Sequence, residues 1–242
     1  MARAMIALIS GSSRGIGLET SRQLGAKGYR VVITGRDGLA GKAAADKLAA
    51  EGHDVVHHPL DVTQDGSVRR IAAFLKEDPR LGHLDVLVNN AGIFPERDPR
   101  TGATLAAVET PLETVRQTWE TNCFGALRLT QAVVPLMRRG GYGRIVNVSS
   151  GYGQLDRMGG GLVGYRLSKA GLNVLTRVFA AELCNEGILV NAVDPGWVRT
   201  RMGGSQAPRD VAVAAEDIVW AATLNDDGPT GRLFHDRRPL PW

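Results

Sequence analysis

The chain has 242 residues, and its 29 lysines and arginines against 25 aspartates and glutamates give a formal net charge of +4. This length suits one α/β domain that folds without disulfides, and two cysteines exclude a disulfide framework and indicate a reducing, cytoplasmic compartment. No apolar run reaches the roughly 20 residues of a membrane helix, and basic residues interleaved with acidic ones argue against nucleic-acid binding.

Short β-rich runs alternate with longer helical segments along the chain. Strands are expected at residues 4–9, 30–34, 53–59, 84–88, 144–148, 188–193 and 231–235. Helices are expected at residues 12–27, 39–51, 64–76, 112–139 with one break, and 164–185. This alternation predicts an α/β fold, a parallel sheet of about seven strands with helices on both faces. No linker interrupts the pattern, so residues 1–242 are predicted to be a single domain.

A glycine-rich turn follows the first strand and opens the first helix. Gly11, Gly15 and Gly17 have the spacing G-x-x-x-G-x-G. Glycines let the backbone approach a pyrophosphate, and the free N–H groups of a helix N-terminus bind phosphate. The spacing differs from the G-x-G-x-x-G dinucleotide fingerprint and, taken alone, suits a plain strand-to-helix connection equally well. Its place at the start of a βαβ unit favours a nucleotide.

The second strand ends at Gly35, which Arg36 follows. An acid at this point binds the ribose 2′-hydroxyl of NAD, whereas an arginine accommodates the 2′-phosphate of NADP. Arg14, in the glycine-rich turn, can reach the same phosphate. We therefore expect NADP. The alternatives are a solvated arginine at a turn and an Arg36 that pairs with Asp37 instead.

Two further strand ends carry candidate nucleotide contacts. Asp61 and Val62 follow the third strand and can hydrogen-bond an adenine edge. Asn89–Gly92 follows the fourth strand. Its small residues let the backbone pass close to a nucleotide, and its asparagine amides can tie neighbouring strand ends together. Taken alone, this segment would be only a turn.

Several residues occur in the order and spacing of one known family. They are Ser10–Gly17, Asn89–Gly92, Asn122, Ser150, Tyr165-x-x-x-Lys169 and Pro195-Gly196. Over essentially its whole length the chain resembles the short-chain dehydrogenases/reductases, and its arginine pair resembles their NADP-dependent, carbonyl reductase-like branch. The resemblance implies a Rossmann-type doubly wound fold. Ser10 stands where the family has threonine, and 15 residues separate Ser150 from Tyr165, slightly more than is common.

The resemblance assigns the chemistry to four residues. Tyr165 is the general acid, Ser150 orients the carbonyl oxygen, and Asn122 holds a water relay to Lys169. The pKa of a free tyrosine is near 10, and lowering it by about 3 units requires about 4 kcal/mol of phenolate stabilisation. Lys169 lies one helical turn from Tyr165, so its charge, with the positive ring of oxidised nicotinamide, can supply that energy.

The expected cofactor is NADP(H), bound along the carboxyl ends of the strands. By the resemblance, the Val198 backbone bonds its carboxamide and Thr200 reaches a phosphate. The expected cofactor contacts are Gly11, Ser13, Arg14, Gly15, Ile16, Gly17, Arg36, Asp61, Val62, Asn89, Ala91, Gly92, Tyr165, Lys169, Pro195, Gly196, Val198 and Thr200.

Three loops are expected to form the substrate site: residues 93–111, 151–164 and 196–210. Residues 201–207 are a candidate lid. The candidate pocket walls are Phe94, Tyr152, Leu155, Met158, Trp197 and Met202. Each of them could instead pack in the core or at an interface. Apolar walls favour a hydrophobic ketone or aldehyde over a charged sugar.

The leading hypothesis is reversible NADPH-dependent reduction of a ketone or aldehyde to an alcohol. A 3-oxoacyl-carrier-protein reductase is the second enzyme hypothesis, and a non-catalytic NADP-sensing protein is the alternative from another class. We expect no metal, because adjacent His57 and His58 would point to opposite faces of a strand. The resemblance implies a homodimer or homotetramer. Leu167, Leu172, Leu175 and Phe179 form an apolar stripe that belongs either to that interface or to the core.

Overall fold

A computed structural model describes residues 3–98 and 100–242, which build one eight-stranded sheet in the order β3-β2-β1-β4-β5-β6-β7-β8. The strands are β1 Ile6–Ile9, β2 Arg30–Gly35, β3 Val55–Pro59, β4 Val86–Asn89, β5 Gly143–Val148, β6 Ile188–Val193, β7 Leu233–His235 and β8 Arg238–Leu240. All neighbouring pairs are parallel except β7 and β8. The strand order turns back between β1 and β4, and ligands of doubly wound sheets bind beside such a switch point.

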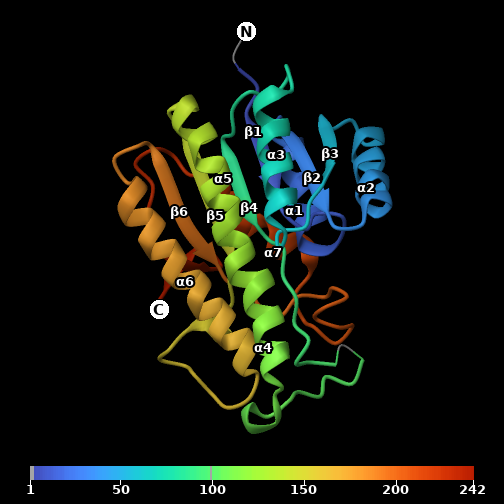
Figure 1. Ribbon diagram of the computed structural model, residues 1–242, viewed down its shortest axis with the longest axis vertical. Helices are drawn as coiled ribbons and strands as arrows, with labels where there is room; N and C mark the ends of the chain where they lie inside the picture. The colour runs from blue at the N-terminus through green and yellow to red at the C-terminus, as the bar shows by residue number, and fades with distance from the viewer. Residues whose placement is uncertain (1–2, 99) are drawn as a thin grey trace.

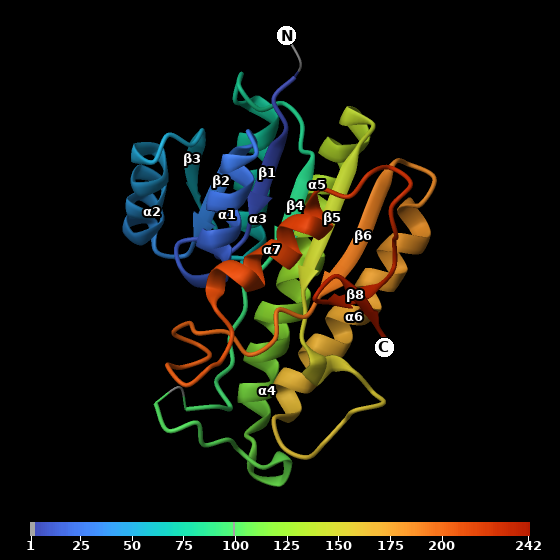
Figure 2. The same cartoon turned by 180° about the vertical axis from the view of Figure 1, so that it is seen from behind.

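Helices cover both faces of the sheet. They are α1 Gly15–Ala26, α2 Gly38–Ala50, α3 Asp65–Glu77, α4 Leu112–Trp119, α5 Gly125–Gly140, α6 Val163–Leu183 and α7 Val211–Ala222. Helices α3, α5 and α6 lie on one face (Figure 1), and α1, α2 and α7 lie on the other (Figure 2). Each face has its own cluster of buried aliphatic side chains. The expected Rossmann-type α/β architecture is therefore confirmed.

The sheet has one strand more than the seven expected. β8 returns antiparallel to β7 through a tight turn at Asp236 and Arg237, which have φ angles of 50° and 60°. Tight hairpin turns need such positive φ values and usually use glycine or asparagine for them. Because neither residue type is present at this turn, the sequence pattern did not predict the hairpin.

Two helical segments also differ from expectation. No helix is expected from the sequence at α7, although Asp210 caps it by accepting the N–H of Ala212 at 2.9 Å, and Ala214, Ile218 and Ala222 are buried at helical spacing. The single break expected in 112–139 is a π-helical turn, Glu120–Phe124, which joins α4 to α5. Within the described residues, no helix has the length and apolar character that crossing a membrane requires.

The loops that follow β4, β5 and β6 gather at one end of the sheet, the lower end in Figure 1. This is the end at which the parallel strands finish. The three loops expected to hold the substrate therefore lie beside the switch point between β1 and β4, and the glycine-rich turn enters the same region from β1.

Candidate active site

The glycine-rich turn packs directly against the backbone that follows β4. Gly11 has a φ of +65°, and a Cβ at this position would lie 3.0 Å from the Cα of Ala91. A Cβ on Gly17 would lie 2.5 Å from Nδ2 of Asn90. Residues larger than glycine are therefore excluded at both positions. The turn and residues 90–92 form one continuous stretch of backbone at the bottom of the cleft, here called the floor.

Ser10 and Asn90 lock this floor in place. The Ser10 Oγ accepts the backbone N–H groups of Asn90 and Ala91, each at 3.0 Å. In return, Nδ2 of Asn90 donates to the carbonyls of Ser10 at 2.9 Å and Gly11 at 3.0 Å. The hydroxyl that Ser10 shares with threonine thus ties the glycine-rich turn to the segment after β4, and Asn90 is a site residue beyond those expected from the sequence.

Two arginines line the cleft, Arg14 directly before α1 and Arg36 directly after β2. Arg14 and Arg36 are both exposed, and in the described part of the chain neither pairs with a carboxylate. Asp37 does not pair with Arg36, because its Oδ1 accepts the N–H groups of Leu39 and Ala40, each at 3.0 Å, as the cap of α2. That alternative to a phosphate role for Arg36 is therefore wrong.

The candidate adenine and strand-end contacts have distinct surroundings. Asp61 and Val62 line the cleft after β3, and Oδ1 of Asp61 accepts the N–H of Thr63 at 3.0 Å. Asn89 does not line the cleft. Its Nδ2 donates to Oδ1 of Asn147 at 2.8 Å, which ties β4 to β5 and holds the neighbouring floor from behind.

Asn122 lies in the π-helical turn and is 2% exposed. Its Oδ1 accepts the N–H of Ile93 at 2.8 Å, and its Nδ2 donates to the carbonyl of Ile93 at 2.9 Å and to Oγ of Ser168 at 3.1 Å. Ser168 in turn donates to the carbonyl of Tyr165 at 2.8 Å. Asn122 therefore links the loop after β4 to helix α6. Such π-helical turns often occur at functional sites.

Tyr165 and Lys169 lie one turn apart on α6, and both are almost fully buried. Nζ of Lys169 lies 5.5 Å from the centroid of the Tyr165 ring and donates to the carbonyl of Val148, at the end of β5, at 2.7 Å. Burial lowers the pKa of Lys169 to about 8, although the charge of Asp194 acts in the opposite direction.

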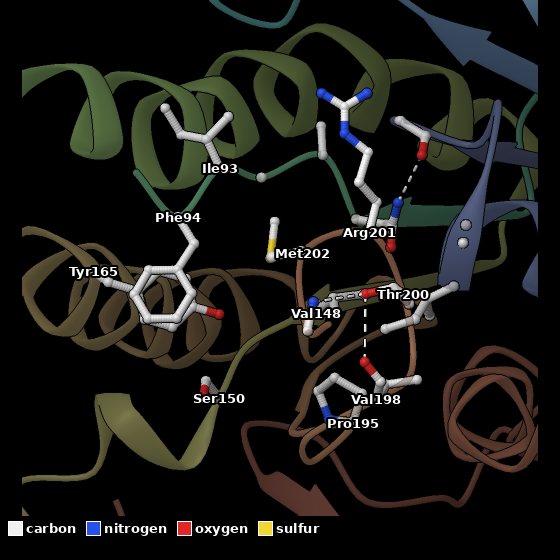
Figure 3. Close-up of a pocket in the computed structure, with 18 of the residues that line it drawn as sticks. Ile93, Phe94, Val148, Ser150, Tyr165, Pro195, Val198, Thr200, Arg201 and Met202 are labelled. Carbon is white, nitrogen blue, oxygen red and sulfur yellow. Dashed lines mark hydrogen bonds between the residues drawn. The ribbon is translucent and has the colours of Figure 1, made fainter. Parts of the chain in front are cut away.

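The phenol of Tyr165 is held neutral by the protein alone. Burial raises its pKa, the charge of Asp194 adds to this rise, and the hydroxyl of Ser150 opposes it. Ser150 lies beside the Tyr165 ring in Figure 3. From the sequence we expect a lowered pKa for Tyr165, caused by Lys169 together with the positive ring of oxidised nicotinamide. Without that ring, the protein raises the pKa of Tyr165 instead.

Aromatic side chains cover the Tyr165 ring. Figure 3 shows Phe94 stacked on it. The centroids of these two rings are 3.9 Å apart, and Tyr152 meets the Tyr165 ring edge-on at 6.1 Å. Four of the expected walls line the cleft: Phe94, Tyr152, Trp197 and Met202. Leu155 and Met158 are exposed and do not line it.

The segment after β6 folds over the glycine-rich turn. A Cβ on Gly15 would lie 3.6 Å from Cγ2 of Thr200. The indole of Trp197 donates to the carbonyl of Gly203 at 2.7 Å, and Arg97 donates to the same carbonyl at 3.2 Å. Arg97, which the sequence analysis missed, therefore ties the loop after β4 to the candidate lid.

One cleft brings these elements together. It is lined by every expected cofactor contact except Asn89. Its narrow backbone floor, the uncapped N-terminus of α1 and the two unpaired arginines fit a dinucleotide phosphate chain and a 2′-phosphate. In residues 3–98 and 100–242, no group of three or more His, Cys, Asp and Glu side chains could hold a metal ion.

Comparisons with known proteins agree with this geometry. The family model described as short chain dehydrogenase matches residues 5–210. NADPH carbonyl reductase 1 of Sus scrofa is 33% identical over 98% of this chain and 94% of its own length. The crystal structure of NADPH-bound carbonyl reductase from chicken fatty liver covers both chains completely with a TM-score of 0.86 at 28% identity, and the carbonyl reductase Sniffer of D. melanogaster reaches 0.88 at 26%.

Proposed function

The chain belongs to the short-chain dehydrogenase family, and from this membership we propose that it is an NADPH-dependent reductase of ketones or aldehydes. One observation carries the proposal. The phenol of Tyr165, the ammonium of Lys169 and the hydroxyl of Ser150 meet in the same cleft that the glycine floor and the free arginines line. The similar NADPH carbonyl reductases support the same reaction and cofactor.

The chain's own residues would divide the chemistry among them. The reduced nicotinamide, when bound, supplies the hydride. Ser150 donates a hydrogen bond to the carbonyl oxygen and turns it toward Tyr165, which gives its proton to that oxygen as negative charge develops. Lys169 keeps a positive charge beside the ring and favours the phenolate that remains. A water relay from Asn122 to Lys169 stays a prediction.

The substrate end of the cleft favours an apolar carbonyl compound. Phe94, Tyr152, Trp197 and Met202 line it, and the last three side chains are 41–49% exposed around its mouth. Apolar side chains left exposed around a cleft are typical of a binding site for hydrophobic ligands. A hydrophobic ketone or aldehyde therefore suits this end better than a sugar.

We further propose that the 242-residue chain acts as a single domain and as a homodimer or homotetramer. Helices α4 and α6 and the π-helical turn after α4 leave apolar side chains exposed, among them Leu112, Phe124, Leu167, Val174 and Val178, at 41–61%. The stripe expected from the sequence divides: Leu172 is 1% exposed and Phe179 packs on the core, whereas Leu167 faces outward. Both cysteines are free, which supports a reducing, cytoplasmic setting.

Tyr165→Phe tests the reaction. The variant keeps the ring that stacks on Phe94 but loses the proton donor, so NADPH oxidation is expected to fall by roughly 10²–10⁴-fold. The measurement is NADPH consumption with a panel of hydrophobic ketones, aldehydes, quinones and a β-ketoacyl thioester. Tyr29→Phe, at the opposite end of the sheet, is the control and should keep full activity.

The panel also separates the alternatives. A marked preference for the β-ketoacyl thioester would favour 3-oxoacyl-carrier-protein reduction. Tight NADPH binding without turnover of any compound would overturn the reductase proposal in favour of a nucleotide-sensing protein.

Arg14→Ala and Arg36→Ala test the choice of cofactor. Each removes a charged hydrogen bond to the 2′-phosphate worth about 1.5–3 kcal/mol, so the Kd for NADPH should rise roughly tenfold or more. The Kd for NADH, which lacks that phosphate, should barely change. Fluorescence titration of both nucleotides measures this, with Arg80→Ala as control. An equal loss for both nucleotides would show that the arginines do not bind the 2′-phosphate.

The pKa of Lys169 predicts how the rate of reduction depends on pH. Because burial lowers its pKa to about 8, its ammonium is present below that pH and lost as the pH rises through it. Carbonyl reduction at saturating NADPH should therefore decline above pH 8, approaching tenfold per unit. Asp194→Asn should move this decline to lower pH, because Asp194 raises the pKa of Lys169.

Lys169→Arg is the matched variant, since arginine stays charged throughout this range. It should react more slowly than the native chain but without the decline above pH 8. A rate for the native protein that stays flat from pH 7.5 to 9.5 would contradict a role for the ammonium.

Light scattering tests the assembly. The native chain of 25.9 kDa is expected at two or four times that mass. Leu167→Glu places a charge on the exposed apolar face and should shift the population toward monomer, whereas Leu39→Glu, at an 85% exposed position on α2, should not. A native monomer at micromolar concentration would refute the proposal.

A further inference from the structure

A buried carboxylate outside the expected catalytic set contacts the start of helix α6. Glu96 is 1% exposed and, in the described part of the chain, pairs with no lysine, arginine or histidine. Its Oε1 accepts the N–H of Gly164 at 3.0 Å, and its Oε2 accepts the N–H of Tyr165 at 2.6 Å. The charge of Glu96 is therefore balanced by backbone donors alone, one of which belongs to the proposed proton donor.

Helix α6 needs this carboxylate because it has no cap of its own. The residue before its first turn is Leu162, which has a φ of 56° and no side-chain oxygen to accept the free N–H groups. Glu96, 68 positions earlier in the chain than Gly164, accepts hydrogen bonds from these N–H groups, and a negative charge is favoured at a helix N-terminus. The start of the helix is thus fixed by a different loop.

The surrounding backbone is shaped around the carboxylate. A Cβ on Gly164 would lie 3.1 Å from Oε2 of Glu96 and 3.0 Å from the Cα of Val115, so a glycine is what leaves room for it. The carbonyl of Glu96 accepts the N–H of Leu105 at 3.0 Å, and the carbonyl of Leu105 accepts the N–H of Leu162 at 3.2 Å. Glu96 therefore sits in a closed ring of hydrogen bonds.

The same segment holds Tyr165 by its side chain as well. Phe94, two residues before Glu96, stacks on the Tyr165 ring at 3.9 Å. One short stretch of the loop after β4 therefore contacts Tyr165 twice, by a hydrogen bond to its backbone N–H and by stacking on its ring. A change at Glu96 would be transmitted to the phenol through both contacts.

We propose that Glu96 is a positioning residue for the reaction, setting the place of the Tyr165 phenol through the backbone of α6. This rests on the reductase function proposed above. Because misplacing a reacting group by about 1 Å can cost about a hundredfold in rate, the loss should fall on kcat. The Glu96 carboxylate makes no hydrogen bond to the glycine-rich turn or to residues 90–92, which form the phosphate floor, so the Kd for NADPH should change little.

Glu96→Gln is the sharpest variant. It keeps the size of the side chain, but an NH₂ group, which cannot accept, replaces one of the two carboxylate oxygens and faces the N–H that this oxygen accepted. We expect kcat for the best panel substrate to fall 10- to 100-fold, with KM and the Kd for NADPH within about twofold. Glu109→Gln, an exposed position in the same loop, is the matched control and should match the native protein.

A solvent isotope effect separates positioning from a purely structural cap, and hydrogen exchange tests whether the cap itself is lost. If the phenol is displaced, proton transfer becomes more limiting, so the effect of D₂O on kcat should be larger in Glu96→Gln than in the native protein. Hydrogen exchange of the peptide covering residues 163–169 should show lost protection at the first amides. Glu96→Asp, which keeps the charge on a shorter side chain, should recover part of kcat.

Gly164→Ala provides a second route to the same displacement, because its Cβ would press on the carboxylate. Lost protection with native kcat in Glu96→Gln would reduce Glu96 to a helix cap and overturn the inference alone. Native protection and native kcat together would show that the carboxylate does not hold α6. No turnover by the native protein would overturn the reductase proposal and this inference with it.

Discussion

The hydrogen bond from Lys169 to the carbonyl of Val148 is the interaction on which the site depends. It joins the middle of α6 to the end of β5 in a region with almost no exposure, so the ammonium has little water to solvate it. Burial then lowers its pKa toward the physiological range. At a pKa of about 8 the ammonium is still mostly present at neutral pH, and the nearby Asp194 and Cys123 offset part of the lowering that burial causes.

A polar contact holds the loop after β4 against this helix. In the described part of residues 94–111, Glu96 is the only buried residue, and it is charged. Its two charged hydrogen bonds are each worth about 1.5–3 kcal/mol, comparable to burying one aliphatic side chain. Because hydrogen bonds are directional, they define where Tyr165 lies more narrowly than an apolar contact of equal energy would.

The sequence predicted the sheet, its two helical layers and the cleft, because hydrophobic periodicity and glycine spacing are local signals. Glu96 could not be found in this way, since its partners lie 68 and 69 positions away and only the fold brings them together. Arg97 escaped for the same reason. Helix α7 did carry a local signal, the Asp210 cap, whereas the β7–β8 hairpin lacks the glycine or asparagine by which such turns are identified.

The two ends of the cleft are built on different physical principles. The phosphate end depends on glycines that have no side chain. A Cβ on Gly11 would press on the backbone of Ala91, and a Cβ on Gly17 would collide with the side-chain amide of Asn90. At the substrate end, side chains supplied by three separate loops matter, and three of them remain 41–49% exposed. Changes in those loops can alter which carbonyl compound fits without disturbing the floor. The contact between Glu96 and α6 links these loops to the chemistry, because Glu96 comes from the loop after β4 and holds the start of the helix that carries Tyr165 and Lys169.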